Sequence, residues 1–427
     1  MQTPLIIIVI GLFIFWGHFL SGVFERKGVP DVLGLMFIGI LIGPVFGLAQ
    51  PADFGRFGSL FSNLVLIFIL FESGTELKIA AIRESLRESA RITTMGFMST
   101  WVTVTLLCVF VFGVPLLPSL FIGATLGGTS SAVVVGLVRK IEVKPKTATT
   151  LIIESAETDV FTLAIPLAIL GLMLYGQIQA LTVVTQFVSS LVLALFIGIA
   201  GSFLWSYIIN KFPTLKATKF STPAFLFILY GISEYLQFSG PLTALSFGIA
   251  IGNLAYFEPE LLRKIIPNQS IILPAGEKDF FSELVFLLRT FFFVFIGISI
   301  QINRMDWLLW GALITAALFL VRMLVVKLIV AKDTPLLDKA VISIMIPKGL
   351  GAAVIATLPL QRMHMDGPII QAICFSVILF STLYCVGLYY LIKKDISLPF
   401  YALLFGKDRN THSLEGQGTA GQDEGLS

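Results

Sequence analysis

Three carboxylates lie close together inside one apolar run of the chain. Glu154, Glu157 and Asp159 fall within residues 151–174, a stretch that is otherwise apolar and long enough to cross a bilayer. Ionisable side chains are costly at membrane depth, so they mark places that bind a cation, a proton or an oppositely charged partner. The segment therefore predicts a site that handles ions.

Helical spacing gives these acidic residues different tasks. Ser155 and Asp159 are four residues apart and share a face, whereas Glu154 and Asp159 diverge by roughly 140° on a helix. Asp159, the Ser155 hydroxyl and oxygens near Thr129 would offer the hard ligands that Na⁺ or K⁺ prefers. Glu154 then remains available to pair with Arg322.

Other polar residues complete the predicted site. Ser130 and Thr158 are further candidates for contact with the cation or proton. Glu72, at the end of an apolar run, is either an additional ligand or a charge at a helix end. Arg289 and Lys348 also fall inside apolar runs, so each is expected to face a carboxylate, a helix end or a wet cavity, or to snorkel to the interface.

The composition places these residues in a membrane protein. The chain of 427 residues is 56% hydrophobic and 13% charged, with a mean hydropathy of +0.93, whereas soluble domains carry about 25% charged residues. A window of about twenty residues predicts thirteen transmembrane helices in an all-α polytopic fold. The predicted spans begin near residues 4, 30, 57, 92, 116, 147, 180, 218, 240, 281, 305, 335 and 367.

Two predicted spans contain residues that break helices. The fifth contains residues 123–131, with three Gly and several hydroxyls, and the twelfth contains Pro347-Lys348-Gly349. Broken backbone is tolerated at membrane depth where it is buried in protein or lines a cavity. Breaks at matching places in two halves are typical of transporters built from inverted repeats, here two of six helices each. Close packing of small residues is the alternative explanation.

The basic residues indicate how the chain is oriented. Lys and Arg gather in the odd-numbered connections and the tail, while the even-numbered connections hold only Arg56, Arg304 and Arg362. By the positive-inside rule the N-terminus is expected outside the cell membrane and the C-terminus in the cytoplasm. The tail, residues 396–427, is expected to be mostly disordered, because residues 408–427 are rich in polar and acidic residues.

Several motifs occurring in order resemble those of a known family. They are Glu154-Ser155 with Asp159 on the sixth span, Arg322 on the eleventh, and Pro347-Lys348-Gly349 on the twelfth, together with Ile42-Gly43-Pro44 on the second and the Arg289–Gly297 segment on the tenth. The chain resembles the monovalent cation/proton antiporters, particularly the prokaryotic sodium/proton exchangers. The resemblance covers about residues 4–395.

The resemblance implies a fold and a mechanism. Within a membrane domain of residues 1–395, helices 1–3 and 7–10 would form a dimerisation domain, and helices 4–6 and 11–13 a mobile core in a homodimer. The residue matching Asp159 would bind cation and proton in turn by alternating access, and those matching Glu154 and Arg322 would form a structural ion pair. The implied partners are the lipid bilayer, Na⁺, K⁺ or Li⁺, and H⁺, with no cofactor and no nucleic acid.

Departures from the family pattern keep alternatives open. Thr158 stands where electroneutral relatives carry Asn and electrogenic ones Asp, and it cannot titrate, which favours one-for-one exchange. Ser130 replaces an Asp common in relatives, so a K⁺/H⁺ antiporter of the potassium-efflux type is the alternative to Na⁺/H⁺ exchange. Lys348 stands where Arg is common. A passive cation channel or an organic-anion transporter of the same architecture is a further alternative; an enzyme is not expected.

Overall fold

Every element of regular secondary structure in the described part of the chain is a helix. The computed structural model describes residues 11, 14–19, 22, 30–76, 88–138, 143–175, 180–216, 218–236, 238–254 and 275–406. Strands do not occur in these ranges, so the prediction of an all-α fold is confirmed for this part. The first predicted span lies largely outside it, as do residues 407–427.

Six helices within these ranges are long and apolar enough to cross a membrane. They are α5 (Glu88–Leu106, continued by the π-helix η3, Leu107–Val111), α8 (Pro145–Tyr175), α9 (Ala180–Lys211), α15 (Ala275–Ser299), α16 (Met305–Ile329) and α19 (Gly367–Lys393). At 1.5 Å per residue, α16 is about 37 Å long, more than the hydrocarbon core of a bilayer.

The remaining helices complete the described part of the fold. They are α2 (Asp31–Ile40) with the π-helix η1 (Leu41–Val45), η2 (Pro51–Phe54), α3 (Gly55–Glu76), α6 (Leu116–Thr125), α7 (Ser131–Val138), α10 (Pro213–Lys216), α11 (Ser221–Tyr235), α12 (Gly240–Gly252), α17 (Leu336–Ile344), α18 (Leu350–Gln361) and α20 (Leu398–Phe405). α20 falls in the predicted tail, and its Tyr401 is buried. For the residues of α20 the structure therefore shows a helix rather than disorder, and the prediction of disorder is left for the residues that follow α20.

Both predicted interruptions coincide with gaps between helices. α6 ends at Thr125 and α7 begins at Ser131, while α17 ends at Ile344 and α18 begins at Leu350. Gly123, counted with the first interruption in the sequence, instead lies inside α6, where a Cβ would approach the Trp101 carbonyl oxygen to 2.7 Å. Its role there is to let α6 pack closely on α5.

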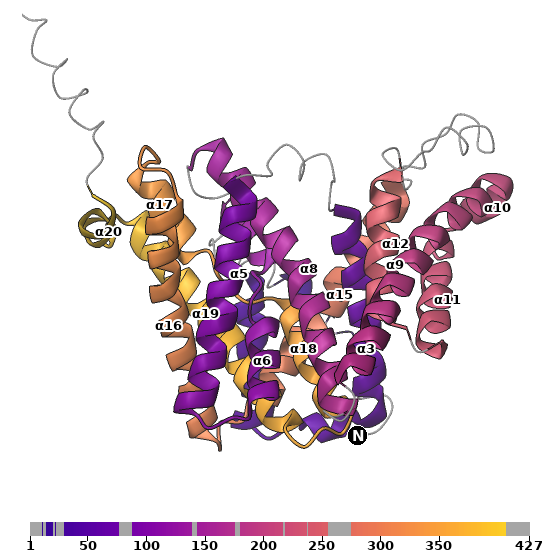
Figure 1. The fold of residues 1–427 in the computed structure, drawn as a ribbon, viewed down its shortest axis with the longest axis horizontal. Helices are drawn as coiled ribbons and strands as arrows, with labels where there is room; N and C mark the ends of the chain where they lie inside the picture. Colours follow the sequence, from indigo (N-terminus) through magenta and orange to yellow (C-terminus); the bar gives the residue numbers. More distant parts are fainter. Residues whose placement is uncertain are drawn as a thin grey trace, which may run out of the picture.

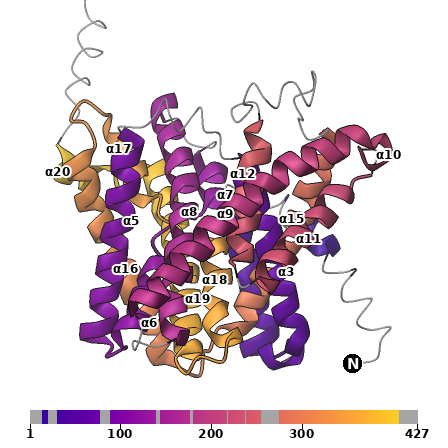
Figure 2. The ribbon, with the colours of Figure 1, turned by 45° about the vertical axis from the view of Figure 1, so that its right-hand side comes forward.

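The helices pack in two groups, on the two sides of Figure 1. One contains α2, α3, α9, α11, α12 and α15; the other contains α5, α6, α8, α16, α17, α18 and α19. The rotated view of Figure 2 keeps α5 and α16 apart from α3 and α15. The two groups meet where α18 contacts α3, α8 contacts α9 and α19 contacts α2.

Glycine pairs bring helices of the first group into backbone contact. A Cβ on Gly39 of α2 would lie 2.8 Å from the Cα of Gly297 of α15, and a Cβ on Gly297 equally close to the Cα of Gly39. Gly74 of α3 and Gly248 of α12 face each other in the same way, at 3.0 and 3.2 Å. Small residues at such crossings let helix backbones approach in membranes.

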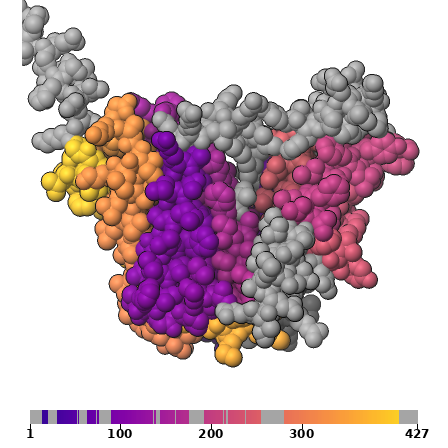
Figure 3. Space-filling view, in the orientation of Figure 1, coloured from indigo at the N-terminus to yellow at the C-terminus, as the bar shows by residue number. Residues whose placement is uncertain are grey.

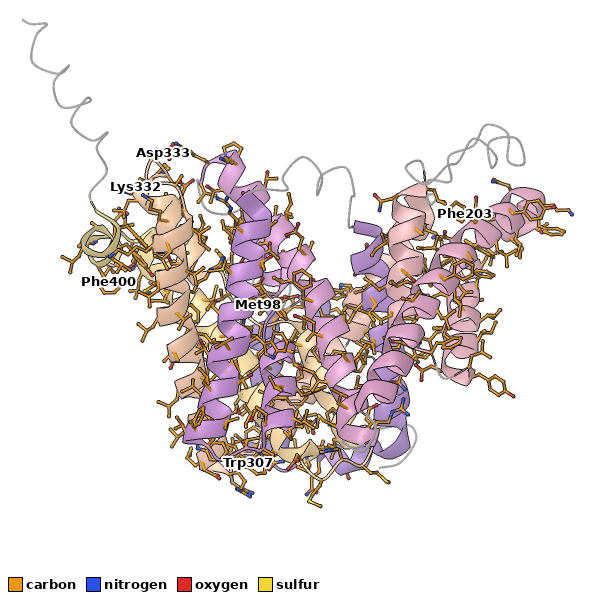
Figure 4. The ribbon with its side chains drawn as sticks, in the orientation of Figure 1. Met98, Phe203, Trp307, Lys332, Asp333 and Phe400 are labelled. Atoms are coloured by element: carbon orange, nitrogen blue, oxygen red, sulfur yellow. The ribbon has the colours of Figure 1, made fainter. Side chains whose placement is uncertain are left out.

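Large apolar side chains cover the outer face of the second group. On α5 they are Met95, Met98, Val102 and Leu106, and on α16 they are Leu309, Leu313, Leu320, Leu324 and Leu328, all exposed. Figure 3 shows this face, with α5 in purple beside the orange of α16 and α17. In Figure 4, Trp307 marks one end of α16 and Lys332 the other. An apolar band between polar ends is the surface that lipid requires.

Candidate cation and proton site

Asp159 lies on α8 opposite the gap between α6 and α7. Its side chain is half-buried, and its Oδ2 accepts a hydrogen bond of 2.6 Å from the hydroxyl of Ser131, the first residue of α7. Sequence reasoning used Ser131 only for the backbone of the break and missed this hydroxyl contact. The interruption of the helix thus brings a donor directly to the predicted ion-binding carboxylate.

Thr158 closes the same gap with its hydroxyl. The Thr158 Oγ1 accepts a hydrogen bond of 3.1 Å from the backbone N–H of Thr129 and lies 3.0 Å from the Thr129 Oγ1. It is also 3.1 Å from the Ser155 carbonyl oxygen, to which it can donate. A break in a helix leaves backbone N–H groups that need partners. The Thr158 hydroxyl is the partner of one such N–H group, that of Thr129, and it adds no charge to the gap.

The remaining predicted ligands have more varied contacts. The Ser155 hydroxyl is fully buried and donates to the Ile152 carbonyl oxygen at 2.8 Å, while Ser130 donates its backbone N–H to the Pro347 carbonyl oxygen at 2.7 Å. Glu72 is half-buried on α3, and its carbonyl oxygen accepts a hydrogen bond from the Thr75 hydroxyl. Contact of these residues with a cation remains a prediction.

Lys348 connects the two interrupted helices. Its buried Nζ donates to the Gly128 carbonyl oxygen at 3.0 Å, and its backbone N–H donates to the Ser381 hydroxyl at the same distance. Next to it, a Cβ on Gly349 would lie 2.9 Å from Ser130 Oγ. The ammonium group is thus held by a backbone carbonyl in the gap between α6 and α7.

Glu154 and Arg322 form a bidentate ion pair. Arg322 Nη1 and Nη2 lie 2.6 and 2.7 Å from Glu154 Oε1 and Oε2, and the Arg322 Nε donates to the Ile342 carbonyl oxygen at 3.2 Å. Both side chains are only 3% exposed. Gly96 of α5 packs on the pair, where a Cβ would lie 2.7 Å from Arg322 Nη1. The pair joins α8, α16 and α17 in the second group of helices.

Arg289 lies outside this cluster. Its Nη2 is 3.0 Å from Oδ2 of Asp31, which joins α15 to α2 in the first group of helices. This pairing was not predicted from the sequence, in which the two side chains lie 258 residues apart.

Two further acidic side chains have partners that sequence reasoning missed. Glu157 Oε2 accepts a hydrogen bond of 2.6 Å from the buried Thr93 hydroxyl of α5. Asp338, at the start of α17, is buried and accepts a hydrogen bond of 2.6 Å from the Thr147 hydroxyl near the start of α8. An acidic residue in the first turn of a helix was the available signal for Asp338.

The arrangement is suited to a monovalent cation or a proton. Around Asp159 the described groups are hydroxyl and carbonyl oxygens, which are ligands for hard cations. Clusters of three or more His, Cys, Asp or Glu side chains that could hold a metal ion are absent from the part of the chain that the structure describes. Arg322 neutralises Glu154, whereas Asp159 accepts a hydrogen bond from the neutral hydroxyl of Ser131.

Relatives of the chain have names that describe antiporters. A region of 239 residues is 28% identical to a protein named K(+)/H(+) antiporter NhaP2 from Shewanella sp. (strain MR-4), covering 55% of this chain and 41% of that protein. A region of 302 residues is 22% identical to a probable Na(+)/H(+) antiporter 2 from Methanocaldococcus jannaschii, covering 68% of each. The chain thus spans less than half the length of the first relative.

The fold and a family model agree with these relatives. The sodium proton antiporter MjNhaP1 from Methanocaldococcus jannaschii superimposes with a TM-score of 0.74 at 19% identity, covering 95% of this chain and all of that structure. This similarity shows a shared fold. The family model described as sodium/hydrogen exchanger, transmembrane, matches residues 8–388. The chain therefore belongs to the transmembrane sodium/hydrogen exchanger family.

Proposed function

We propose that this chain exchanges one monovalent cation for one proton across the cell membrane, with Asp159 binding the two in turn. The observation that carries the proposal is the half-buried Asp159 carboxylate on α8, set against the oxygen-rich gap between α6 and α7. A cation and a proton that need the same carboxylate exclude each other, so each promotes release of the other. The family and the fold are those of transporters rather than enzymes.

Na⁺ is the cation we propose, and K⁺ is the alternative. The family model and the Methanocaldococcus relative support Na⁺. Two observations favour K⁺: several relatives carry K⁺/H⁺ names, and Ser130 offers a neutral oxygen at the break. Thr158 favours one-for-one exchange, because its hydroxyl cannot carry a second titrating charge.

The packing of the helices supports alternating access between two domains. In this proposal α2, α3, α9, α11, α12 and α15 belong to a dimerisation domain of a homodimer, and the second group forms the mobile core within residues 1–395. The gaps at residues 126–130 and 345–349 support the proposal of thirteen helices in two inverted six-helix repeats. The distribution of Lys and Arg favours an outside N-terminus and a cytoplasmic C-terminus.

The decisive experiment removes the charge of Asp159. In proteoliposomes, proton flux driven by Na⁺, K⁺ or Li⁺ is measured with and without a clamped membrane potential. Asp159→Asn is expected to abolish flux with every cation, because the amide cannot exchange a proton for a cation. Independence of the wild-type rate from the clamped potential would support one-for-one exchange.

Glu157→Gln is the matched control for this experiment. It removes a carboxylate two residues away on the same helix, one that accepts a hydrogen bond from Thr93 rather than from Ser131. We expect this variant to retain cation-driven flux. Exchange that survived in Asp159→Asn would refute the assignment of Asp159.

A further inference from the structure

Thr162 is a buried side chain beside the break that the proposed mechanism does not use. It lies on α8, three residues after Asp159 and four after Thr158, so the three side chains share the face of the helix that meets the gap between α6 and α7. The residue is 2% exposed. Thr162 thus extends the polar face of α8 by one helical turn.

The Thr162 hydroxyl has no hydrogen-bond partner among the described residues. A threonine inside a helix can donate to the carbonyl oxygen four residues earlier, here that of Thr158, but this bond is not made. Buried polar groups nearly always have a partner, so an unpartnered hydroxyl in a membrane core needs an explanation. Other hydroxyls on this face, those of Thr158 and Ser155, are already hydrogen-bonded.

The Thr162 hydroxyl packs directly against Gly128, a residue of the break. A Cβ built on Gly128 would overlap the Thr162 Oγ1 and would lie 3.1 Å from the Thr158 carbonyl oxygen. The Gly128 carbonyl oxygen is the group that holds the Lys348 ammonium. The unused hydroxyl and a backbone carbonyl therefore border the same point of the interrupted helix.

We propose that Thr162 is a ligand of the transported monovalent cation, and this inference rests on the proposed exchange at Asp159. A dehydrated alkali cation needs several oxygen ligands, and Thr162 Oγ1 can coordinate without giving up an existing hydrogen bond.

The test compares three variants in proteoliposomes with NaCl and with KCl. Thr162→Val keeps the shape of the side chain and removes the oxygen. It is expected to raise the apparent KM for the transported cation by about tenfold, as for the loss of one good polar contact. Thr162→Ser keeps the oxygen and is expected to retain the wild-type KM. The melting temperature of Thr162→Val should equal or exceed that of the wild type, because an unpartnered hydroxyl is removed.

Thr125→Val is the matched control. Thr125, at the end of α6, is the other buried threonine near the break whose hydroxyl has no described hydrogen-bond partner. It should tolerate the change without a rise in KM. An unchanged KM in Thr162→Val, or an equal rise in both valine variants, would overturn the inference.

Binding provides a second measurement that does not require transport. Addition of NaCl or KCl to the detergent-solubilised protein should raise the melting temperature of the wild type, and by less for Thr162→Val. An equal rise in both would overturn the ligand role. If Asp159→Asn still exchanges ions, the proposed function fails; if only the Thr162 results are negative, exchange at Asp159 stands.

Discussion

Two ion pairs of the same chemistry occupy opposite environments in this protein. The two terminal guanidinium nitrogens of Arg322 lie 2.6 and 2.7 Å from the two carboxylate oxygens of Glu154, and both side chains are 3% exposed. Arg362, just after α18, lies 3.6 Å from Glu234 of α11, and the two side chains are 62% and 35% exposed. The first pair lies within one group of helices, whereas the second joins the two groups.

From this difference we expect that burial, rather than the presence of opposite charges, decides how much an ion pair contributes to the stability of the fold. Water screens the Glu234–Arg362 pair and can replace either partner, so its formation and loss are nearly balanced. Glu154 and Arg322 have lost that water, and each would be left as a buried charge without the other. A pair that is costly to separate suits a rigid unit, and a weak pair suits a contact between units that move.

Removal of Arg322 should have the largest effect. Arg322→Ala leaves Glu154 charged and buried, which typically costs ~3–5 kcal/mol. We expect a strongly lowered melting temperature and poor expression, measured in detergent by thermal unfolding.

The double variant Glu154→Leu with Arg322→Met sharpens this prediction. It removes both charges and fills the space with apolar groups, so it should be clearly more stable than Arg322→Ala. Near-normal thermal stability of Arg322→Ala would show that the pair does not hold the helices together.

The Arg289–Asp31 pair is intermediate in burial between the two pairs compared above. Its atoms are 3.0 Å apart, with side chains 24% and 16% exposed, between the two extremes. Asp31→Asn should therefore cost about 1–2 kcal/mol, a discounted value for a partly hydrated charged hydrogen bond. The melting temperature of this variant should fall between those of Arg322→Ala and the wild type, and any other order would contradict the dependence on burial.

Removal of Arg362 should have the smallest effect on stability. Arg362→Ala is expected to cost less than about 1 kcal/mol, as for other exposed pairs. The matched control Arg362→Lys keeps the charge, and both variants should unfold within a few degrees of the wild type. Because salt screens exposed charges, the small difference between them should vanish at high ionic strength. A large loss in Arg362→Ala would mean that the two groups of helices depend on this contact.

Sequence patterns with a fixed geometry were the ones that predicted structure well. The residues Gly127-Gly128 and Pro347-Lys348-Gly349 indicated where helices stop, since clustered Pro and Gly disfavour helical backbone. The divergence of Glu154 from Asp159 also follows from helical geometry, and Arg322 was one of three cations inside apolar runs that needed a partner.

Contacts between distant segments could not be predicted in this way. Lys348 binds a backbone carbonyl, which any residue could supply, so its partner Gly128 left no mark in the sequence. Asp31 and Thr93 resemble ordinary residues near the start of a helix, and only the packing of α2 on α15 and of α5 on α8 gives them partners. The lengths of some helices also differ from those of the predicted spans. For example, α12 has 13 residues, whereas the window used for prediction assumes about twenty.

The glycine crossings described above restrict which changes the chain can accumulate. An added side chain at Gly39 or Gly297 would meet backbone atoms of the facing helix rather than a side chain that can be exchanged for a smaller one. A damaging substitution there has no local suppressor, because no second replacement can shorten a main chain. A side chain added to either glycine of the α2–α15 crossing therefore cannot be compensated by a second substitution nearby. The exposed Glu234–Arg362 contact, in contrast, can be lost and regained one residue at a time.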